Sequence, residues 1–134
     1  MLANRSIPDS VVMPELAYEN VPEAARWLCD AFGFQERLRI ADHRVQLTFG
    51  SGAVVVIERH GDQARSSVLV RVEDAERHHD RAVQHGARIL RPPTDYPFGE
   101  RQYTAQDLGG HVWTFSQTIA DVDPASWDGT MVQE

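Results

Sequence analysis

The side chains best suited to chemistry in this chain are histidines and one cysteine. His78 and His79 are adjacent in a predicted helix and point in different directions, while His85 lacks the four-residue spacing from His78 that chelates a metal well. His111 follows a Gly-Gly turn, and we expect it to hydrogen-bond that turn. Cys29 falls within an apolar helix, where burial raises the pKa of a thiol and hides it. We therefore expect the helix histidines to be solvated and Cys29 not to act as a nucleophile.

Two opposite charges, Glu58 and Arg71, are the other candidates, because each lies at the end of a predicted strand. A carboxylate in a pocket could act as a base, but the pKa of a carboxyl beside an arginine is lowered, which makes it a weak base. The alternative is a plain ion pair in a cavity that side chains fill. The choice depends on the elements that carry the two residues.

A pattern of strand, helix and three strands occurs twice along the chain. In each copy an alternating apolar strand leads to a capping residue, Asn20 or Asp74, and the amphipathic helix that follows ends near a glycine, Gly33 or Gly86. Two copies are too few for a solenoid, so we expect two tandem modules within one domain. The predicted modules are residues 11–59 and 66–117.

Apolar alternation and turn signals give the expected elements of each module. The first has strands at 11–19, 34–40, 44–49 and 53–58, with a helix after the first strand. The second has a helix at 75–85 and strands at 67–72, 87–91, 101–106 and 111–117. Residues 91–99 are expected to form an extended loop, because prolines are excluded from a central strand. Residues 118–134 form a tail, and its Trp127 predicts packing on the body or on a partner subunit.

Length and composition indicate one globular domain that spans residues 1–134. Hydrophobic residues make up 42% and charged residues 25% of the chain, and no apolar run is long enough to cross a bilayer. The net charge of -7 argues against nucleic-acid binding and favours cationic small molecules. Because Cys29 is the only cysteine, no internal disulfide can form, which favours a cytoplasmic location.

The chain resembles the vicinal oxygen chelate superfamily, which contains glyoxalase I, extradiol dioxygenases and bleomycin-resistance proteins. The resemblance covers about residues 11–117. It rests on the doubled βαβββ order, on the helix end Ala31-Phe32-Gly33-Phe34, and on the turn Asp107-Leu108-Gly109-Gly110-His111-Val112-Trp113. It implies an α+β fold in which two tandem βαβββ modules form a cupped mixed sheet with helices on the convex face. It also implies a ligand site in the concave face and a homodimer.

The resemblance implies in addition where a metal site would lie. Enzymes of this superfamily hold a divalent ion with His and Glu side chains from the first and last strands of each module. In this sequence the first-strand positions fall at Pro14 and Ser67. The last-strand positions fall at Thr114 and at Val56, or at Glu58 if the register shifts by two residues. One carboxylate does not hold a metal against water, so we expect no metal ligands and no cofactor.

Strand parity predicts which side chains line the cup. If Thr114 and Glu58 face inward, alternate residues of the neighbouring strands do so too, and together they make apolar walls with opposing charges. The aromatic residues Tyr103, Tyr96 and Phe98 either overhang the mouth of the cup or pack elsewhere. The predicted ligand-binding residues are Leu16, Tyr18, Val56, Glu58, Leu69, Arg71, Tyr103 and Thr114.

Two functions agree with these features. The first is a metal-independent binding protein, similar to the bleomycin-resistance branch, that sequesters a drug-like or metabolite ligand in the cleft. Its aromatic rings would stack on a cationic or aromatic compound. The second is a lyase, isomerase or dioxygenase with a non-standard metal site or with Glu58 as base. We favour the binding function, because it needs only what the sequence shows.

Overall fold

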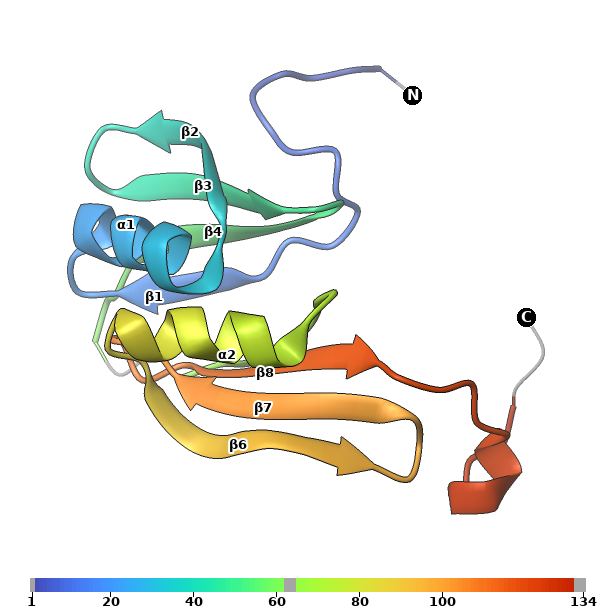
Figure 1. Cartoon of the computed structure of the whole chain (residues 1–134). Helices are drawn as coiled ribbons and strands as arrows, with labels where there is room; N and C mark the ends of the chain where they lie inside the picture. The colour runs from blue at the N-terminus through green and yellow to red at the C-terminus, as the bar shows by residue number, and fades with distance from the viewer. Residues whose placement is uncertain (1, 62–64, 132–134) are drawn as a thin grey trace.

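The computed structural model describes residues 2–61 and 65–131, and these form two βαβββ modules (Figure 1). The first module contains β1 (Glu15–Tyr18), α1 (Val21–Phe32), β2 (Gln35–Ile40), β3 (Arg44–Phe49) and β4 (Gly52–Glu58). The second contains β5 (Ser67–Arg71), α2 (Ala75–Gln84), β6 (Arg88–Tyr96), β7 (Glu100–Gln106) and β8 (Val112–Thr118). A 3-10 helix, η1 (Pro124–Trp127), follows. The predicted α+β fold of two tandem modules is confirmed.

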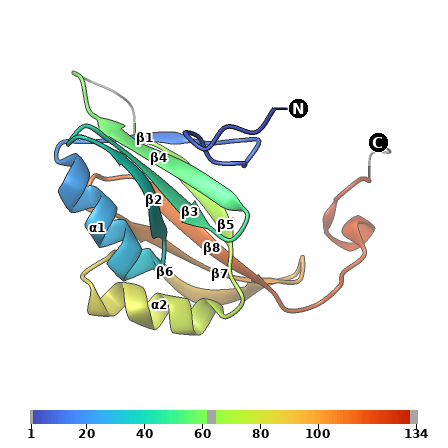
Figure 2. The same cartoon turned by 90° about the horizontal axis from the view of Figure 1, so that it is seen from above.

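Each module is a four-stranded mixed sheet covered by one helix. The strand orders are β1-β4-β3-β2 and β5-β8-β7-β6, with β1 parallel to β4, β5 parallel to β8, and the other neighbours antiparallel. Figures 1 and 2 show both helices on the same side of the molecule, where α1 and α2 contact each other. In the part of the chain that the structure describes, the sheets are separate ladders, and no helix is long and apolar enough to cross a membrane.

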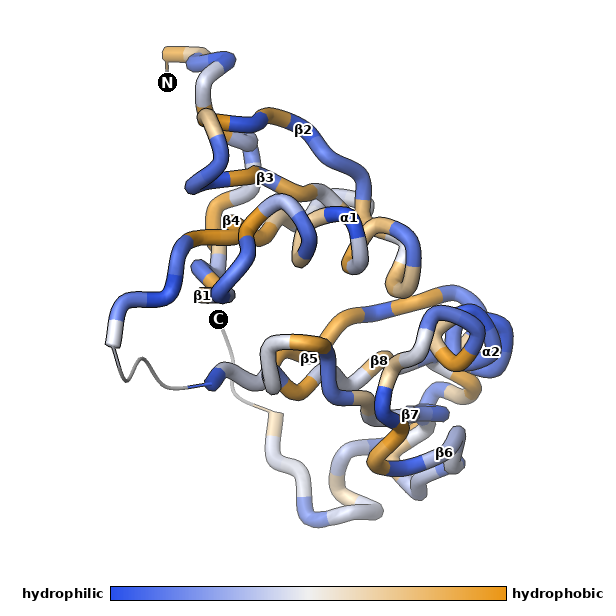
Figure 3. Tube along the Cα trace, turned by 90° about the vertical axis from the view of Figure 1, so that its left-hand side faces the viewer, coloured by the Kyte–Doolittle hydropathy of each residue, from blue (hydrophilic) through white to orange (hydrophobic). Residues whose placement is uncertain are grey.

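Local signals start the two helices where the sequence predicts. The side chain of Asn20 accepts a hydrogen bond from the backbone N–H of Glu23 at 3.0 Å, and Asp74 does the same for Arg77 at 3.0 Å. Helix α1 ends at Gly33, whose φ of 86° is in the left-handed region that glycine adopts without strain. The hydropathy trace of Figure 3 shows apolar residues along the strands and a mostly hydrophilic α2.

One hydrophobic core runs through both modules. Phe32, at the end of α1, is fully buried, and its ring centroid lies 5.4 Å from that of Trp113 and 4.8 Å from that of Phe115, both in β8. Phe34 contacts Trp113 as well, with ring centroids 5.5 Å apart. Aromatic residues of the first module therefore complete the core of the second, and the two modules pack as one unit.

A buried carboxyl group fastens the two modules at their junction. Asp107 Oδ2 accepts from the Tyr18 hydroxyl at 2.6 Å and from Trp113 Nε1 at 2.9 Å, while Oδ1 accepts from the backbone N–H groups of Gly109 and His111 at 2.9 and 3.0 Å. Position 109 requires glycine, because a Cβ there would lie 2.5 Å from Cδ2 of Tyr18. The Asp-Leu-Gly-Gly turn thus has a structural role.

His111 is fully buried beside this turn. Its Nδ1 accepts from the backbone N–H of Ser66 at 2.8 Å, so Nε2 carries the proton and donates to the carbonyl of Ala17 at 2.8 Å. The prediction that His111 hydrogen-bonds the turn is confirmed for its backbone N–H group, which donates to the carboxyl group of Asp107. The ring itself joins β1 to the residue before β5.

Strand β6 is longer than predicted, because it continues through Pro92 and Pro93 to Tyr96. The two prolines lie where the register with β7 shifts, between Arg91 and Thr94, and β6 is the edge strand of its sheet. A residue without a backbone N–H group is tolerated both at a register shift and in an edge strand. The expected loop at 91–99 is therefore largely strand.

The aromatic residues at the tip of the β6–β7 hairpin hold the chain that follows β8. Tyr96 and Phe98 stack with ring centroids 5.3 Å apart, and Trp127 of η1 packs on Phe98 at 5.4 Å. Tyr96 and Phe98 thus pack against each other and the tail, as one of the two alternatives predicts. Trp127 remains 45% exposed.

Candidate ligand-binding cleft

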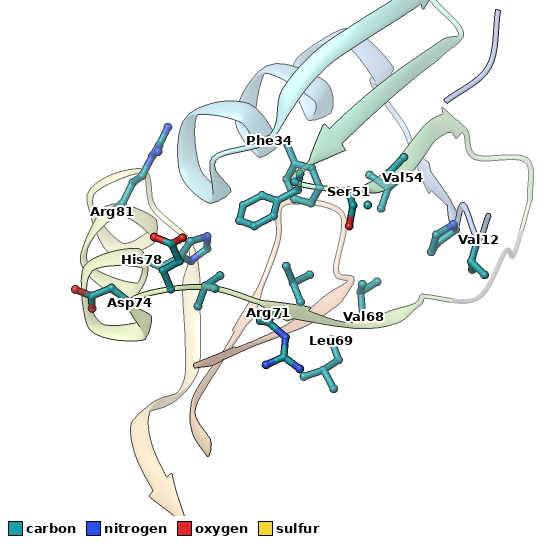
Figure 4. Close-up of a pocket in the computed structure, with 18 of the residues that line it drawn as sticks. Val12, Phe34, Ser51, Val54, Val68, Leu69, Arg71, Asp74, His78 and Arg81 are labelled. Carbon is teal, nitrogen blue, oxygen red and sulfur yellow. The ribbon is translucent and has the colours of Figure 1, made fainter. Parts of the chain in front are cut away.

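A cleft of about 900 Å³ lies between the two modules (Figure 4). One wall comes from the first module: residues before β1, Phe34 between α1 and β2, and the β3–β4 hairpin. The other wall comes from β5, the residues that join it to α2, and one side of α2 as far as Arg81. The lining residues are Val12, Pro14, Phe34, Phe49, Gly50, Ser51, Gly52, Ala53, Val54, Val68, Leu69, Val70, Arg71, Val72, Glu73, Asp74, Arg77, His78 and Arg81. The volume is within the range of small-molecule sites, roughly 300–1,000 Å³.

The sequence places apolar side chains at the centre of this cleft. Phe34 follows Gly33, and its ring lies 5.3 Å from that of Phe49 at the end of β3. Val68 and Val70 pack against the core from β5. Because side chains alternate along a strand, Leu69 and Arg71 turn the other way, toward the rim, and Leu69 is 67% exposed (Figure 4). The result is an apolar cleft with a charged rim.

His78 of α2 borders the cleft and has both ring nitrogens engaged. Nδ1 bonds the Tyr103 hydroxyl at 2.5 Å and Nε2 bonds the carbonyl of Phe32 at 2.7 Å. Burial lowers the pKa of His78 and raises that of Tyr103, so the phenol donates to Nδ1 and Nε2–H donates to the carbonyl. The expectation of a solvated His78 is wrong. The residue joins α2 to the end of α1, and it has no free nitrogen to act as a base.

The partly buried His78 predicts that the stability depends on pH. Because its folded-state pKa is below the ordinary value of about 6.5, the unfolded chain takes up the proton more readily. The free energy of unfolding should therefore fall as the pH drops below about 6.5, until the folded-state pKa is passed.

Urea unfolding of the wild type and of His78→Gln, between pH 8 and pH 5, tests this prediction. Glutamine can accept from Tyr103 and donate to Phe32, but it does not titrate. The wild type should lose more stability on acidification than the variant. Equal slopes for the two proteins would contradict the prediction.

The predicted cup residues of the first module are on the wrong face. Leu16, Tyr18 and Val56 belong to the buried core, on the face of their sheet that packs against α1. Glu58 pairs in register with Tyr18 at the end of β4, outside the cleft, and its side chain is 49% exposed. Tyr103 is fully buried under α2, opposite Phe115.

A one-residue slip explains these errors. Measured from the capping residues Asn20 and Asp74, Leu69 corresponds to Glu15, and their neighbours across the ladder are Thr114 and Val55. The counterpart of Thr114 is therefore Val55, not Val56. A slip of one residue exchanges the two faces of a strand.

In the second module, the predicted faces of Leu69, Arg71 and Thr114 are right. All three lie on the face of the sheet opposite α2, where Thr114 Oγ1 is 3.1 Å from Thr104 Oγ1. Arg71 donates to Thr118 Oγ1 at 2.7 Å, while the carboxyl oxygen of Glu58 lies 4.0 Å from His60 Nε2. Neither the shared pocket nor the ion pair between Glu58 and Arg71 is formed.

The N-terminal segment covers the corresponding open face of the first sheet. Arg37 donates to the carbonyl of Arg5 at 2.9 Å, and Gln46 donates to that of Ser6 at 2.8 Å. Pro8 is buried, and Gln46 is 5% exposed. Figure 2 shows this segment on the face away from α1. The strand predicted at 11–19 is shorter in the structure, where β1 begins at Glu15 and ends at Tyr18.

The sequence profile of the Glyoxalase/Bleomycin resistance protein/Dioxygenase superfamily matches residues 10–115. The chain belongs to this superfamily. No curated protein matches the chain. Among solved structures, TioX from Micromonospora sp. ML1 is 35% identical, with a TM-score of 0.73 over 81% of this chain and 98% of that one.

More distant superfamily members share the fold. A glyoxalase-related enzyme from Fulvimarina pelagi is 17% identical, with a TM-score of 0.67 over 93% of this chain and 98% of that one. Lactoylglutathione lyase from Agrobacterium tumefaciens is 14% identical, with a TM-score of 0.68 over 82% of this chain and 94% of that one. These two likenesses support the fold alone.

The metal site that the superfamily resemblance implies does not fit the residues present. With the one-residue slip corrected, the first-module counterpart of Ser67 is Met13 rather than Pro14. The four positions at which the superfamily enzymes carry metal ligands are then Met13, Val55, Ser67 and Thr114. None of these side chains is an imidazole or a carboxylate. Among the described residues, no group of three or more His, Cys, Asp and Glu side chains is arranged to hold a metal ion.

Sequence reasoning missed most of the cleft. Of the predicted ligand-binding residues only Leu69 and Arg71 line it, while Phe34, Phe49 and Val68 were not predicted. Strand parity bears on the open faces of the sheets, whereas the cleft lies between the modules and depends on how they pack. Burial raises the pKa of the Cys29 thiol, as predicted, and this makes it a poor nucleophile.

Proposed function

We propose that this superfamily member is a metal-independent binding protein that takes up a small molecule in the cleft between its two modules. The cleft itself is the observation that carries the proposal: about 900 Å³, with apolar side chains at its centre. Among the described residues that line it, His78 supplies the one imidazole, and both of its ring nitrogens are engaged. Of the carboxylates that line it, Asp74 caps α2 and Glu73 is exposed to water, so the cleft offers mainly contact area.

A base role for Glu58 has little support. This residue is at the end of β4, half-exposed, and does not line the cleft. We therefore expect Glu58→Ala to leave ligand binding unchanged, whereas an enzyme that used Glu58 would lose its turnover.

A homodimer in the cytoplasm remains part of the proposal. Strand β5 is an edge strand, and its Leu69 is 67% exposed, which favours pairing with another chain. Light scattering of the purified protein measures the oligomeric state.

Filling the mouth of the cleft should abolish binding. Ser51 is an exposed residue of the β3–β4 turn, and its hydroxyl points toward β5 in Figure 4. In Ser51→Trp the indole would occupy the mouth of the cleft without replacing a core residue. We expect it to weaken the binding of aromatic fluorescent probes, such as N-phenyl-1-naphthylamine, by at least about tenfold.

Asp42→Trp is the matched control, because it adds the same indole to the exposed β2–β3 turn, which does not line the cleft. Probe titration of the wild type and both variants gives the result directly. Equal affinities of Ser51→Trp and Asp42→Trp would exclude the cleft as the binding site.

A further inference from the structure

We infer that the cleft selects an uncharged aromatic ligand. The inference rests on the proposed function and deepens it by naming the class of ligand. The acidic net charge of the whole chain predicts a cationic compound, but the charges that line the cleft are distributed differently. Three arginines and two carboxylates line it, namely Arg71, Arg77, Arg81, Glu73 and Asp74, so the negative charge of the chain is not concentrated there.

Two of the arginines are bonded elsewhere. Arg71 donates from Nη1 to Thr118 Oγ1 at 2.7 Å. Arg81 donates from Nε to the carbonyl of Asp30 at 2.9 Å and from Nη2 to that of Cys29 at 3.2 Å, and so satisfies the end of α1. Figure 4 shows both guanidinium groups directed away from the centre of the cleft. An anionic ligand would have to break these bonds to gain a partner.

The carboxylates are no better placed for a cationic ligand. Asp74 caps α2 by accepting from the N–H of Arg77. Glu73 and the side chain of Arg77 are both exposed at the rim, so a cationic ligand would meet a like charge as well as an opposite one there. The rim thus supplies water-facing charges of both signs.

At the centre of the cleft, a ligand would meet apolar and aromatic surface. Phe34, Phe49, Val54 and Val68 supply it, and Figure 4 shows Val68 directed toward the first module. The adjacent His78 is an imidazole whose two nitrogens already have partners. A charged ligand would lose its hydration there without gaining a counter-charge, whereas an uncharged ring system would lose little. Flat rings also stack favourably on the ring of Phe49, which is partly exposed.

A matched series of probes tests this inference on the full-length protein. N-phenyl-1-naphthylamine is uncharged, its 8-sulfonate carries a negative charge, and a derivative of the same rings with a trimethylammonium group carries a positive charge. We expect the uncharged probe to bind at least about tenfold more tightly than either charged one, by fluorescence titration at 0.15 M salt.

A conservative pair of variants shows whether the probes occupy the cleft. Val68→Thr keeps the side-chain shape but puts a hydroxyl at the centre of the cleft, and should weaken binding of the uncharged probe about five- to tenfold. Val83→Thr makes the same change on the exposed surface of α2, outside the cleft, and should have no effect. Thermal unfolding of both variants checks that the fold is kept.

The outcomes separate this inference from the proposed function. If a charged probe binds as tightly as the uncharged one and Val68→Thr weakens it, the ligand class is wrong while the binding function stands. If Val68→Thr and Val83→Thr behave alike for all three probes, the cleft is not the binding site and both proposals fail.

Discussion

Asp107→Ala is expected to lower the free energy of unfolding by about 3–5 kcal/mol, a large fraction of the roughly 5–15 kcal/mol that stabilises a typical domain. The carboxyl group of Asp107 accepts four hydrogen bonds, and two of the donors are the buried side chains of Tyr18 and Trp113. Without the carboxyl, the Tyr18 hydroxyl and the Trp113 indole N–H would be buried with no acceptor, and each costs about 1–3 kcal/mol. The junction between the modules would loosen at the same time.

Asp95→Ala is the control for this prediction. Asp95 is also a bonded aspartate, held by Arg101 Nε at 2.6 Å, but its side chain is 55% exposed. Exposed ion pairs contribute about 0–1 kcal/mol. Urea denaturation of the wild type and both variants gives the comparison. A loss for Asp107→Ala no larger than that for Asp95→Ala would show that the Asp107 network does not hold the modules together.

Phe32→Ala should cost about 3–5 kcal/mol and should affect both modules at once. The ring is fully buried and packs on Trp113 and Phe115 of the other module, so its removal leaves a cavity at the interface of the two. Because the core is continuous, the variant should still unfold in one transition, at lower urea.

The matched surface variant is Leu90→Ala, which truncates a side chain that is 47% exposed on β6 and should cost less than about 0.5 kcal/mol. Fluorescence and circular dichroism followed together would reveal whether the modules unfold jointly. Two separate transitions in Phe32→Ala would mean that the modules are independent, contrary to the packing described above.

Local sequence signals predicted the elements well, because the interactions that start and stop them are short-range. Asn20 and Asp74 cap the helices as their spacing indicates, and Gly33 ends α1 with a positive φ. Strand β6 differs because an edge strand accepts prolines that a central one does not. Whether a strand is an edge depends on the order of the sheet, which the sequence of that strand does not contain.

The candidate site was harder to predict, because it depends on register and on module packing. Aligning Thr114 with Val56 instead of Val55 placed Leu16 and Tyr18 in the cup, although both are in the core. The capping residues would have corrected this, since they lie at fixed distances from the paired strands. The cover that Pro8 and its neighbours form over the first sheet had no signal in the sequence.

His78 could have been predicted as partly buried from the helix pattern. It shares one face of α2 with Ala75 and Ala82, both fully buried, at spacings of three and four residues. A histidine on such a face packs against the core and needs hydrogen-bond partners there. Tyr103 and Phe32 provide them, but they come from distant parts of the chain.

The dissociation constant of chelator-treated protein for N-phenyl-1-naphthylamine, with and without added divalent ions, tests the central claim most directly. A metal-independent cleft predicts a constant on the order of 10 µM that does not change when manganese, nickel, iron or zinc is added. Binding that appears only after one of these ions is restored would contradict the account and would favour an enzyme with a metal held by other residues.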